Sequence, residues 1–336
     1  MKREQKVRGA FALVEVVTVL VLLGLVCSVG VVAGAQSRTS AGLAGSLANL
    51  KKIGEVTGNY AADYEDQLWS LTWHTGYAPS EYDDLQNPAS SSEAVGYQAV
   101  DIVRRLYRED FSRFDDRLGT YWLSTLVLAD YLDESLPLEW TVSPGDKVRL
   151  EWQLDPDNPP DLNEQGGAGW SAMFAGFGSS YELMPAFFAP DEKVDRQDTI
   201  SQYNRHHNLT WLPSGIKFGG RRVNEVLFPS QKVHMAERAS FFFGPTPAHY
   251  LHAEARVPVL MADGSASPRT SADANDSFRP NSPNNPDGTS LTDYKPNPIY
   301  EPPTLSGGAG DSGIETHYKW TRRGLRGIDF NGQRAE

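Results

Sequence analysis

Cysteine is almost absent from this chain, which has 336 residues and a single Cys at position 27. One thiol cannot form an intrachain disulfide, and zinc sites built on cysteine need two or more. Cys27 also lies inside a long apolar run. The polar remainder of the chain therefore has to be held together by packing, hydrogen bonds and ion pairs.

Basic residues are outnumbered, because 31 Lys and Arg stand against 43 Asp and Glu, a formal net charge of −12. Proteins that bind nucleic acid need basic patches, so this balance argues against a nucleic-acid partner. The first ten residues reverse the sign, with Lys2, Arg3, Lys6 and Arg8 against Glu4. By the positive-inside rule, this local excess predicts an N-terminus that stays in the cytoplasm.

Sequence patterns typical of enzymes are also missing. The chain has no Gly-x-Ser-x-Gly nucleophile motif and no His-Glu-x-x-His zinc motif. The histidines are scattered, and hydrogen-bonded or solvated side chains explain them better than a metal site: His74, His206, His207, His234, His249, His252 and His317. We therefore predict a protein that is not an enzyme and that requires no cofactor.

One long hydrophobic run dominates the N-terminal region. About 25 apolar positions, Phe11 to Ala35, follow the basic segment. A helix of that length is about 37 Å long, which is enough to cross a bilayer core. Glu15 is the only charged residue in the run. A carboxylate costs about 2.5–3.5 kcal/mol at the centre of a membrane helix and less near an end, so Glu15 needs a partner.

These features together resemble the N-terminus of a type IV prepilin or a type II secretion pseudopilin. That family has a short basic leader, a small residue before the cleavage site, Phe as the first mature residue and Glu as the fifth. Here the match is Phe-Ala-Leu-Val-Glu, which places the cut between Ala10 and Phe11 and makes Glu15 the fifth mature residue. The family prefers Gly before the cut, whereas this chain has Ala10 there and Gly9 one place earlier.

The resemblance implies processing and assembly. A prepilin peptidase would remove the leader, residues 1–10, and Phe11 would be N-methylated. Glu15 would then neutralise the amino group of Phe11 on a neighbouring subunit or on its own chain. The resemblance also implies a single-pass inner-membrane protein with a cytoplasmic N-terminus and a periplasmic or extracellular head. Its partners would be other pseudopilin subunits, in a type II secretion or type IV pilus-like filament that serves protein secretion.

The transmembrane helix, 11–35, is expected to continue as an amphipathic helix over 36–66. Apolar residues recur there at intervals of three and four: Leu43, Leu47, Leu50, Ile53, Val56, Tyr60 and Tyr64. Two further segments resemble a group of prepilin-like proteins from Planctomycete-type bacteria. They are LANLKKIG, from Leu47 to Gly54, and WTRRGLRGIDF, from Trp320 to Phe330.

The remaining residues, 67–336, are predicted to form an α+β head with a mainly antiparallel sheet and a helical insertion. We expect two helices within 93–133, a β-hairpin over 138–152, and a buried strand over 256–266 that ends in the Asp263-Gly264 turn. Residues 267–313 are expected to form an exposed loop, because they are rich in Pro, Gly and Asn. Tyr318 and Trp320 are expected to pack back onto the head as an edge strand.

Four acidic residues of that loop are candidate calcium ligands: Asp273, Asp276, Asp287 and Asp293. Calcium takes six to eight oxygen ligands, and neighbouring Asn and Ser residues supply more oxygen atoms. The spacing does not match an EF-hand, however, and Asp and Asn are ordinary turn residues. The alternative is that these side chains only form turns.

Two other interpretations of the N-terminus stay open. If the leader is not cleaved, the protein is a membrane-tethered module whose head binds a polymer or partner at the cell surface. The small residues before Gln36 also match a signal peptidase site, and cleavage there would remove the anchor.

Overall fold

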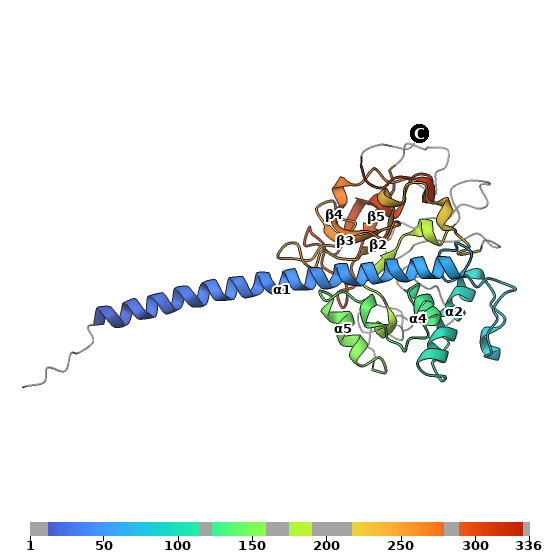
Figure 1. Cartoon of the computed structure of the whole chain (residues 1–336), viewed down its shortest axis with the longest axis horizontal. Coiled ribbons are helices and arrows are strands. Elements are labelled where there is room, and N and C mark those ends of the chain that lie inside the picture. The colour runs from blue at the N-terminus through green and yellow to red at the C-terminus, as the bar shows by residue number, and fades with distance from the viewer. Residues whose placement is uncertain (1–12, 114–122, 159–174, 190–216, 279–288, 332–336) are drawn as a thin grey trace, which may run out of the picture. The chain divides into compact units, whose positions relative to one another are not determined.

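The computed structural model describes residues 13–113, 123–158, 175–189, 217–278 and 289–331, with only the backbone of residues 13–36 (Figure 1). The chain divides into two compact units, Met1–Gly42 and Leu43–Glu336. Its fold is α+β with antiparallel sheets, which confirms the predicted fold class at that level.

Helix α1 spans Leu13–Asp63, and its last part belongs to the second unit. We call the segment of α1 from Leu43 to Asp63 the stem. Its buried residues recur at helical spacing, and Leu50 and Ile53 are completely buried. The apolar periodicity of the sequence therefore corresponds to a face that packs into the head. Tyr64, just past the stem, is an exception because it is 46% exposed.

The stem ends at a left-handed turn. Glu65 and Asp66 have φ angles of 53° and 63°, which no helix continues through. The amide of Asp66 donates to the carbonyl of Ala61 at 2.8 Å and satisfies one of the last helical carbonyl groups. The carbonyl of Asp66 then accepts the amide of Val223 at 2.8 Å, so the turn is also tied to a distant part of the head.

The main sheet has four antiparallel strands in the order β1-β2-β3-β4. The strands are β1 (Tyr181–Leu183), β2 (Val233–Glu237), β3 (Arg256–Met261) and β4 (Ala266–Thr270). Strand β3 and the turn at Gly264, where φ is 83°, confirm the strand and turn predicted over 256–266. Pro258 and Pro268 face each other across β3 and β4, and β4 is an outer strand of this sheet. A second sheet pairs β5 (Leu291–Tyr294) with β6 (Asp311–Glu315).

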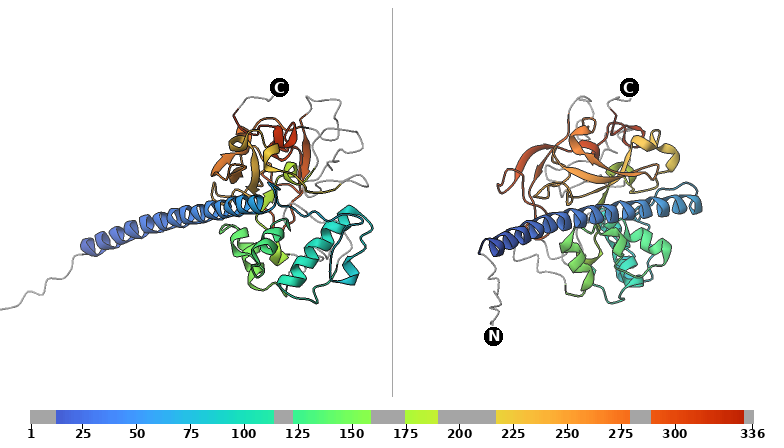
Figure 2. Two further views of the ribbon diagram at one scale, coloured as in Figure 1. Left: turned by 45° about the vertical axis from the view of Figure 1, so that its right-hand side comes forward. Right: turned by 60° about the vertical axis from the view of Figure 1, so that its left-hand side comes forward.

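Three helices form a layer on the other side of the stem from the main sheet (Figures 1 and 2). They are α2 (Ser91–Leu106), α4 (Leu126–Leu132) and α5 (Lys147–Leu154). Helices α2 and α4 confirm the two predicted within 93–133. Ser90 caps α2, because its hydroxyl oxygen accepts the amide of Glu93 at 3.1 Å. The stem is thus covered by strands on one side and by helices on the other.

The β-hairpin predicted over 138–152 is wrong. Its first arm contains a short 3-10 helix, Glu139–Thr141, and its second arm is α5. Asp146 explains the difference, because Oδ1 accepts the amide of Arg149 at 3.2 Å and starts a helix where a hairpin turn was expected. Arg149 and Trp152, three positions apart on that helix, are both buried.

The exposed loop predicted over 267–313 is also wrong in large part. It contains the end of β4, all of β5 and the start of β6, and Tyr294 within it is completely buried. The hydroxyl of Tyr294 donates to the carbonyl of Pro302 at 2.6 Å. Long-range contacts of this kind order a segment whose composition alone is typical of loops.

The C-terminal segment returns to the head as predicted, but in another conformation. Tyr318 and Trp320 are 1% and 7% exposed. Tyr318 lies in a 3-10 turn, His317–Lys319, and Trp320 directly follows it, so neither lies in the predicted edge strand. The carbonyl of Trp320 accepts the amide of Phe278 at 2.8 Å, which joins this turn to the segment before β5.

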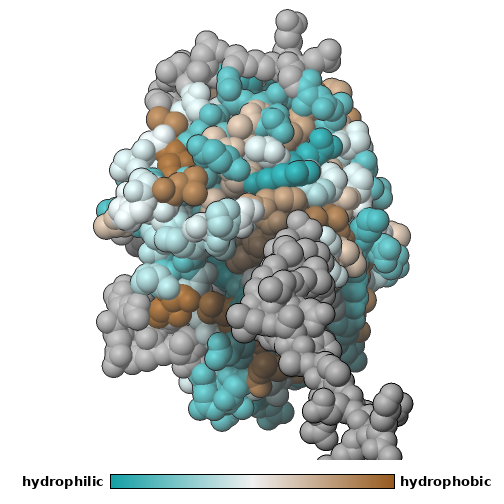
Figure 3. Space-filling view, turned by 90° about the vertical axis from the view of Figure 1, so that its left-hand side faces the viewer, coloured by the Kyte–Doolittle hydropathy of each residue, from teal (hydrophilic) through white to brown (hydrophobic). Residues whose placement is uncertain are grey.

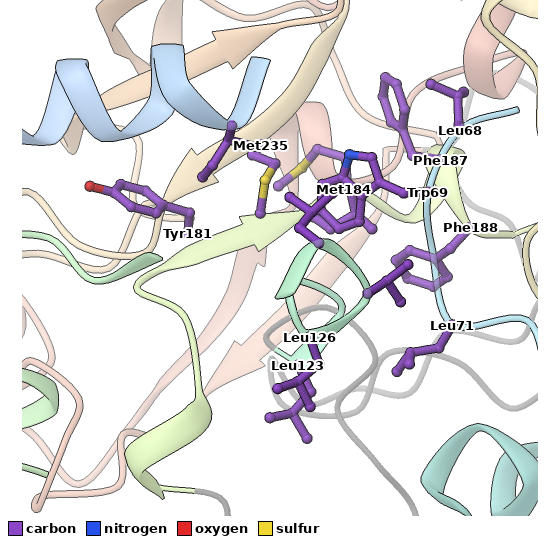
Figure 4. Close-up of a cluster of buried hydrophobic side chains, with 14 of the residues drawn as sticks. Leu68, Trp69, Leu71, Leu123, Leu126, Tyr181, Met184, Phe187, Phe188 and Met235 are labelled. Carbon is purple, nitrogen blue, oxygen red and sulfur yellow. The ribbon is translucent and has the colours of Figure 1, made fainter. Parts of the chain in front are cut away.

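The main core lies where the stem, β1 and the loop after the stem meet (Figure 4). Trp69 is completely buried, and its Nε1 donates to Oγ1 of Thr57 on the stem at 2.7 Å. Trp73 is also buried, whereas Tyr77 is 53% exposed. Core packing of the two tryptophans, the simpler interpretation of this aromatic loop, is therefore confirmed.

Within the part of the chain that the structure describes, no helix combines the length and the apolar composition that a membrane span requires. The run predicted to do so, Phe11 to Ala35, lies outside that part of the chain, apart from the backbone of α1. The transmembrane prediction therefore stays a prediction.

Gly54 of the stem packs against Leu260 and Gly264 at the end of β3 and gives a first prediction. A Cβ atom there would lie 3.2 Å from the Cα of Gly264 and 3.2 Å from Cδ1 of Leu260, whereas one at Gly58 would meet nothing within 4 Å. Alanine stabilises an open helical site by about 1 kcal/mol relative to glycine. We expect Gly58→Ala to raise the free energy of unfolding by about this amount. Gly54→Ala should raise it much less, because the new Cβ atom crowds Leu260 and Gly264. Urea unfolding of the detergent-solubilised chain measures both, and equal gains would contradict the close contact.

Candidate functional site

The residues that the sequence assigns to processing and assembly lie at the edge of what the structure describes. Gly9, Ala10 and Phe11 lie outside the described residues. Glu15 lies on the backbone of α1, and its side chain is outside the described part. Their roles therefore stay predictions. What the structure adds is how the stem is built into the head.

A polar contact joins the stem to two strands of the main sheet. The hydroxyl of Ser46, on the stem, donates to Oε1 of Glu237 on β2 at 2.7 Å. The same hydroxyl lies 3.1 Å from the hydroxyl of Tyr181 on β1. All three side chains are completely buried. We call Ser46, Tyr181 and Glu237 the stem contact, and Figure 4 shows Tyr181 at the start of β1.

Glu237 holds a proton in the folded protein under physiological conditions. Burial raises the pKa of its carboxyl from 4.5 to about 8, although the hydroxyls of Ser143 and Ser46 partly offset the shift. The nearby carboxylate of Asp146 raises the pKa further. A protonated carboxyl avoids the cost of a buried charge and fits a contact made with hydroxyl groups.

The structure also brings together a cluster of buried charged residues around Glu182 of β1. Oε1 of Glu182, on β1, lies 3.1 Å from Nζ of Lys319 and accepts the hydroxyl of Tyr250 at 2.9 Å. Its Oε2 lies 3.8 Å from Nε of Arg238, whose Nη2 donates to Oε1 of Glu301 at 3.0 Å. We call these five residues the ionic cluster. Each of them is less than 9% exposed.

The ionic cluster joins segments that the chain places far apart. Glu182 is on the sheet, Glu301 lies between β5 and β6, and Lys319 lies in the C-terminal turn. Breaking a buried ion pair by removing one partner typically costs about 3–5 kcal/mol, because an uncompensated charge is left behind. Together with buried aromatic side chains such as Tyr294 and Tyr318, the cluster is suited to fix these segments on the sheet.

The histidines do not assemble a metal centre in the described residues. No group of three or more His, Cys, Asp or Glu side chains there is arranged to hold a metal ion. His234 packs against Phe187, with ring centres 4.4 Å apart, and burial lowers its pKa to about 3, so it is neutral. His252 has Nε2 at 3.7 Å from Oδ2 of Asp311. His206 and His207 lie outside the described residues.

The candidate calcium ligands are likewise not brought together where the structure describes them. Asp273, Asp276 and Asp293 belong to no such group, and Asp287 lies outside the described residues. Asp263 serves its own turn, because Oδ1 accepts the amide and the hydroxyl of Ser265 at 2.9 and 2.6 Å.

Neither the stem contact nor the ionic cluster is predicted by the patterns of the sequence. Charged residues in a polar sequence are usually solvated, and nothing near them in the chain marks them as buried. The one available signal was their position. Glu182 lies within the otherwise largely apolar stretch YELM, and Glu237 follows Met235 and Ala236.

The stem contact predicts how stability depends on pH. Glu237 is neutral when folded but ionises when unfolded, so its contribution to stability is fully present below pH 4.5 and is lost as the pH rises to about 8. The loss amounts to about 3–5 kcal/mol. We expect Glu237→Gln, which stays neutral, to remove that part of the slope.

Unfolding of the wild type and of Glu237→Gln by urea, measured between pH 5 and pH 9, tests this. Glu55→Gln is the control, because Glu55 is an exposed carboxylate on the stem, which the stem contact joins to Glu237. The two variants should differ in slope, with the control following the wild type. A Glu237→Gln curve parallel to the wild type would show that Glu237 is ionised in the folded protein.

Comparisons of the chain with protein-family models, with curated proteins and with solved structures give no match. We therefore infer the function from the residues of this chain and from the arrangement described above.

Proposed function

We propose that this protein is a non-enzymatic, pseudopilin-like subunit. It is anchored in the inner membrane by its N-terminal helix, with the leader in the cytoplasm and the head in the periplasm or outside the cell. A prepilin peptidase cleaves between Ala10 and Phe11, and the new amino terminus is methylated. The mature subunit then assembles with other subunits into a type II secretion or type IV pilus-like filament.

The observation that carries this proposal is the spacing at the start of α1. A basic leader is followed by Phe11 and, four positions later, by Glu15, the only charged residue of a run of about 25 apolar residues. A plain anchor gains nothing from a carboxylate there, because burying it is costly. A carboxylate that meets the amino group of Phe11 on a neighbour forms an ion pair, and that pair sets the register between subunits.

The fold of the second unit supports a role for α1 in carrying load. The stem is part of the main core, and its Ser46, Leu50 and Ile53 are all completely buried. A head that only needed tethering would have no reason to build its core around the tether. Because the core includes the stem, a force or displacement applied to the stem is transmitted to the sheet and to the helical layer.

Processing is tested by the mass of the protein extracted from membranes. We expect a chain that starts at Phe11 and carries one extra methyl group. Ala10→Gly should be processed at least as completely, because Gly is the residue that the resembled family prefers there, whereas a bulky Ala10→Leu should stay uncut. An intact leader in the wild type, with Ala10→Gly also uncut, would contradict the proposal. A chain that starts at Gln36 would contradict it as well.

Assembly is tested by Glu15→Ala. We expect this variant to be cleaved and methylated but not to enter filaments, because the amino group of Phe11 then has no carboxylate partner in the apolar bundle. Glu55→Ala is the control, since it removes a carboxylate from an exposed site of the same helix. Sheared filament fractions and crosslinking in membranes report assembly. Normal assembly of Glu15→Ala would refute the role assigned to Glu15.

A membrane-tethered binding module is the second candidate function. The second unit, Leu43–Glu336, is large for a subunit that only assembles. It also exposes apolar side chains: Val223, Leu227 and Phe228 are 40%, 58% and 37% exposed. On the face seen in Figure 3, hydrophobic surface is divided into small patches among hydrophilic residues. An uncut leader would favour this second function.

A further inference from the structure

A lysine and an aspartate meet in the interior of the head. Nζ of Lys232, just before β2, lies 3.3 Å from Oδ1 of Asp329 near the C-terminus. The side chains are 0% and 1% exposed, so water is excluded from the pair. The two residues are 97 positions apart in the chain.

Two further groups contact the carboxyl of Asp329, one on each oxygen. The hydroxyl of Thr321 donates to Oδ1 and also accepts Nζ of Lys232 at 2.5 Å, so it lies between amine and carboxyl. The backbone amide of Val233 donates to Oδ2 at 2.7 Å. We call Lys232, Asp329, Thr321 and the amide of Val233 the Lys–Asp site.

The surroundings of the Lys–Asp site favour neutral groups over ions. Burial raises the pKa of the Asp329 carboxyl, although the ammonium group of Lys232 and the hydroxyl of Thr321 partly offset the shift. Transfer of one proton from the ammonium group to the carboxylate removes both charges from a site without water. The result is an amine with a free electron pair beside a carboxylic acid.

We propose that Lys232 and Asp329 condense to form an intramolecular isopeptide bond. The electron pair of Nζ attacks Cγ of Asp329, and the new C–N bond gives a tetrahedral intermediate. The amide of Val233 stabilises the negative charge that develops on Oδ2, as in an oxyanion hole. Oδ1 then leaves as water, and Thr321 relays the proton from Nζ to it. One amide and one water replace one amine and one carboxylic acid, and no oxidant or cofactor is consumed.

The bond would covalently attach the C-terminal segment of the head to the main sheet. Thr321 and Asp329 both belong to the C-terminal segment WTRRGLRGIDF, and Lys232 leads directly into β2. The C-terminal segment would then be unable to leave the sheet, even when the head is under load. A chain without structural disulfides gains in this way a crosslink that does not depend on redox conditions.

Peptide mass spectrometry of the purified full chain tests the proposal. Trypsin does not cut after an acylated lysine, so we expect the peptide from Val223 to Arg238 to stay joined to the peptide from Gly327 to Arg334, lighter by one water than their sum. Asp329→Asn should give the same linked peptide with loss of ammonia instead of water. Lys232→Met and Asp329→Ala should give none.

Two controls separate the isopeptide bond from other reactions. Loss of water within one peptide forms a succinimide and joins no second peptide, whereas the isopeptide bond joins the peptide from Val223 to Arg238 to the peptide from Gly327 to Arg334. Lys319 and Glu182 are a second buried pair, 3.1 Å apart, in which the second contact on Oε1 comes from the hydroxyl of Tyr250. Since no backbone amide supports it in the described structure, this pair should remain unlinked.

Thr321→Val tests the relay, because it keeps both reacting groups and removes the hydroxyl between them. We expect a much smaller linked fraction in this variant than in the wild type at the same time after synthesis. Equal linkage would refute the role of Thr321. Full recovery from the wild type of separate peptides that end at Lys232 and at Arg334 would overturn the proposal as a whole.

Discussion

The head of this protein depends on one helix that it shares with the N-terminal region. The stem supplies Leu50 and Ile53 to the core, so neither the sheet nor the helical layer can be completed without it. At Gly54 the backbone of the stem comes within contact of the turn that joins β3 and β4. The stem is therefore an internal part of the head, and a mutation on its buried face acts on the whole of the second unit.

Buried polar groups link distant segments of the head, a role that disulfides have in other proteins. The stem contact fixes the stem on β1 and β2 through hydroxyl groups and a protonated carboxyl at Glu237. The ionic cluster around Glu182 fixes segments from the C-terminal third of the chain on the sheet. Burying such groups is costly, so their contribution lies mainly in specifying one arrangement, since any other would leave a charge without a partner.

Local patterns predicted the fold where local forces decide it. The helical periodicity before Tyr107, the buried strand over 256–266 and the core position of Trp69 all follow from short-range spacing and hydrophobicity. The hairpin over 138–152 failed because one side chain, Asp146, caps a helix there. The prediction for 267–313 was wrong for another reason, and the stem contact and the ionic cluster were not predicted for the same reason. Their partners are distant in sequence, and no local pattern identifies them.

The edge of the main sheet matters when many heads are held close together. Pro258 and Pro268 lie directly opposite each other on β3 and β4. Because proline has no amide hydrogen, they form a non-hydrogen-bonded pair, in which the backbone groups of Pro268 point away from β3. The outer edge of β4 therefore lacks a hydrogen-bond donor at Pro268, and a strand from another molecule cannot continue the ladder there. Two heads that meet at this edge would therefore come into contact without joining their sheets, so they stay separable.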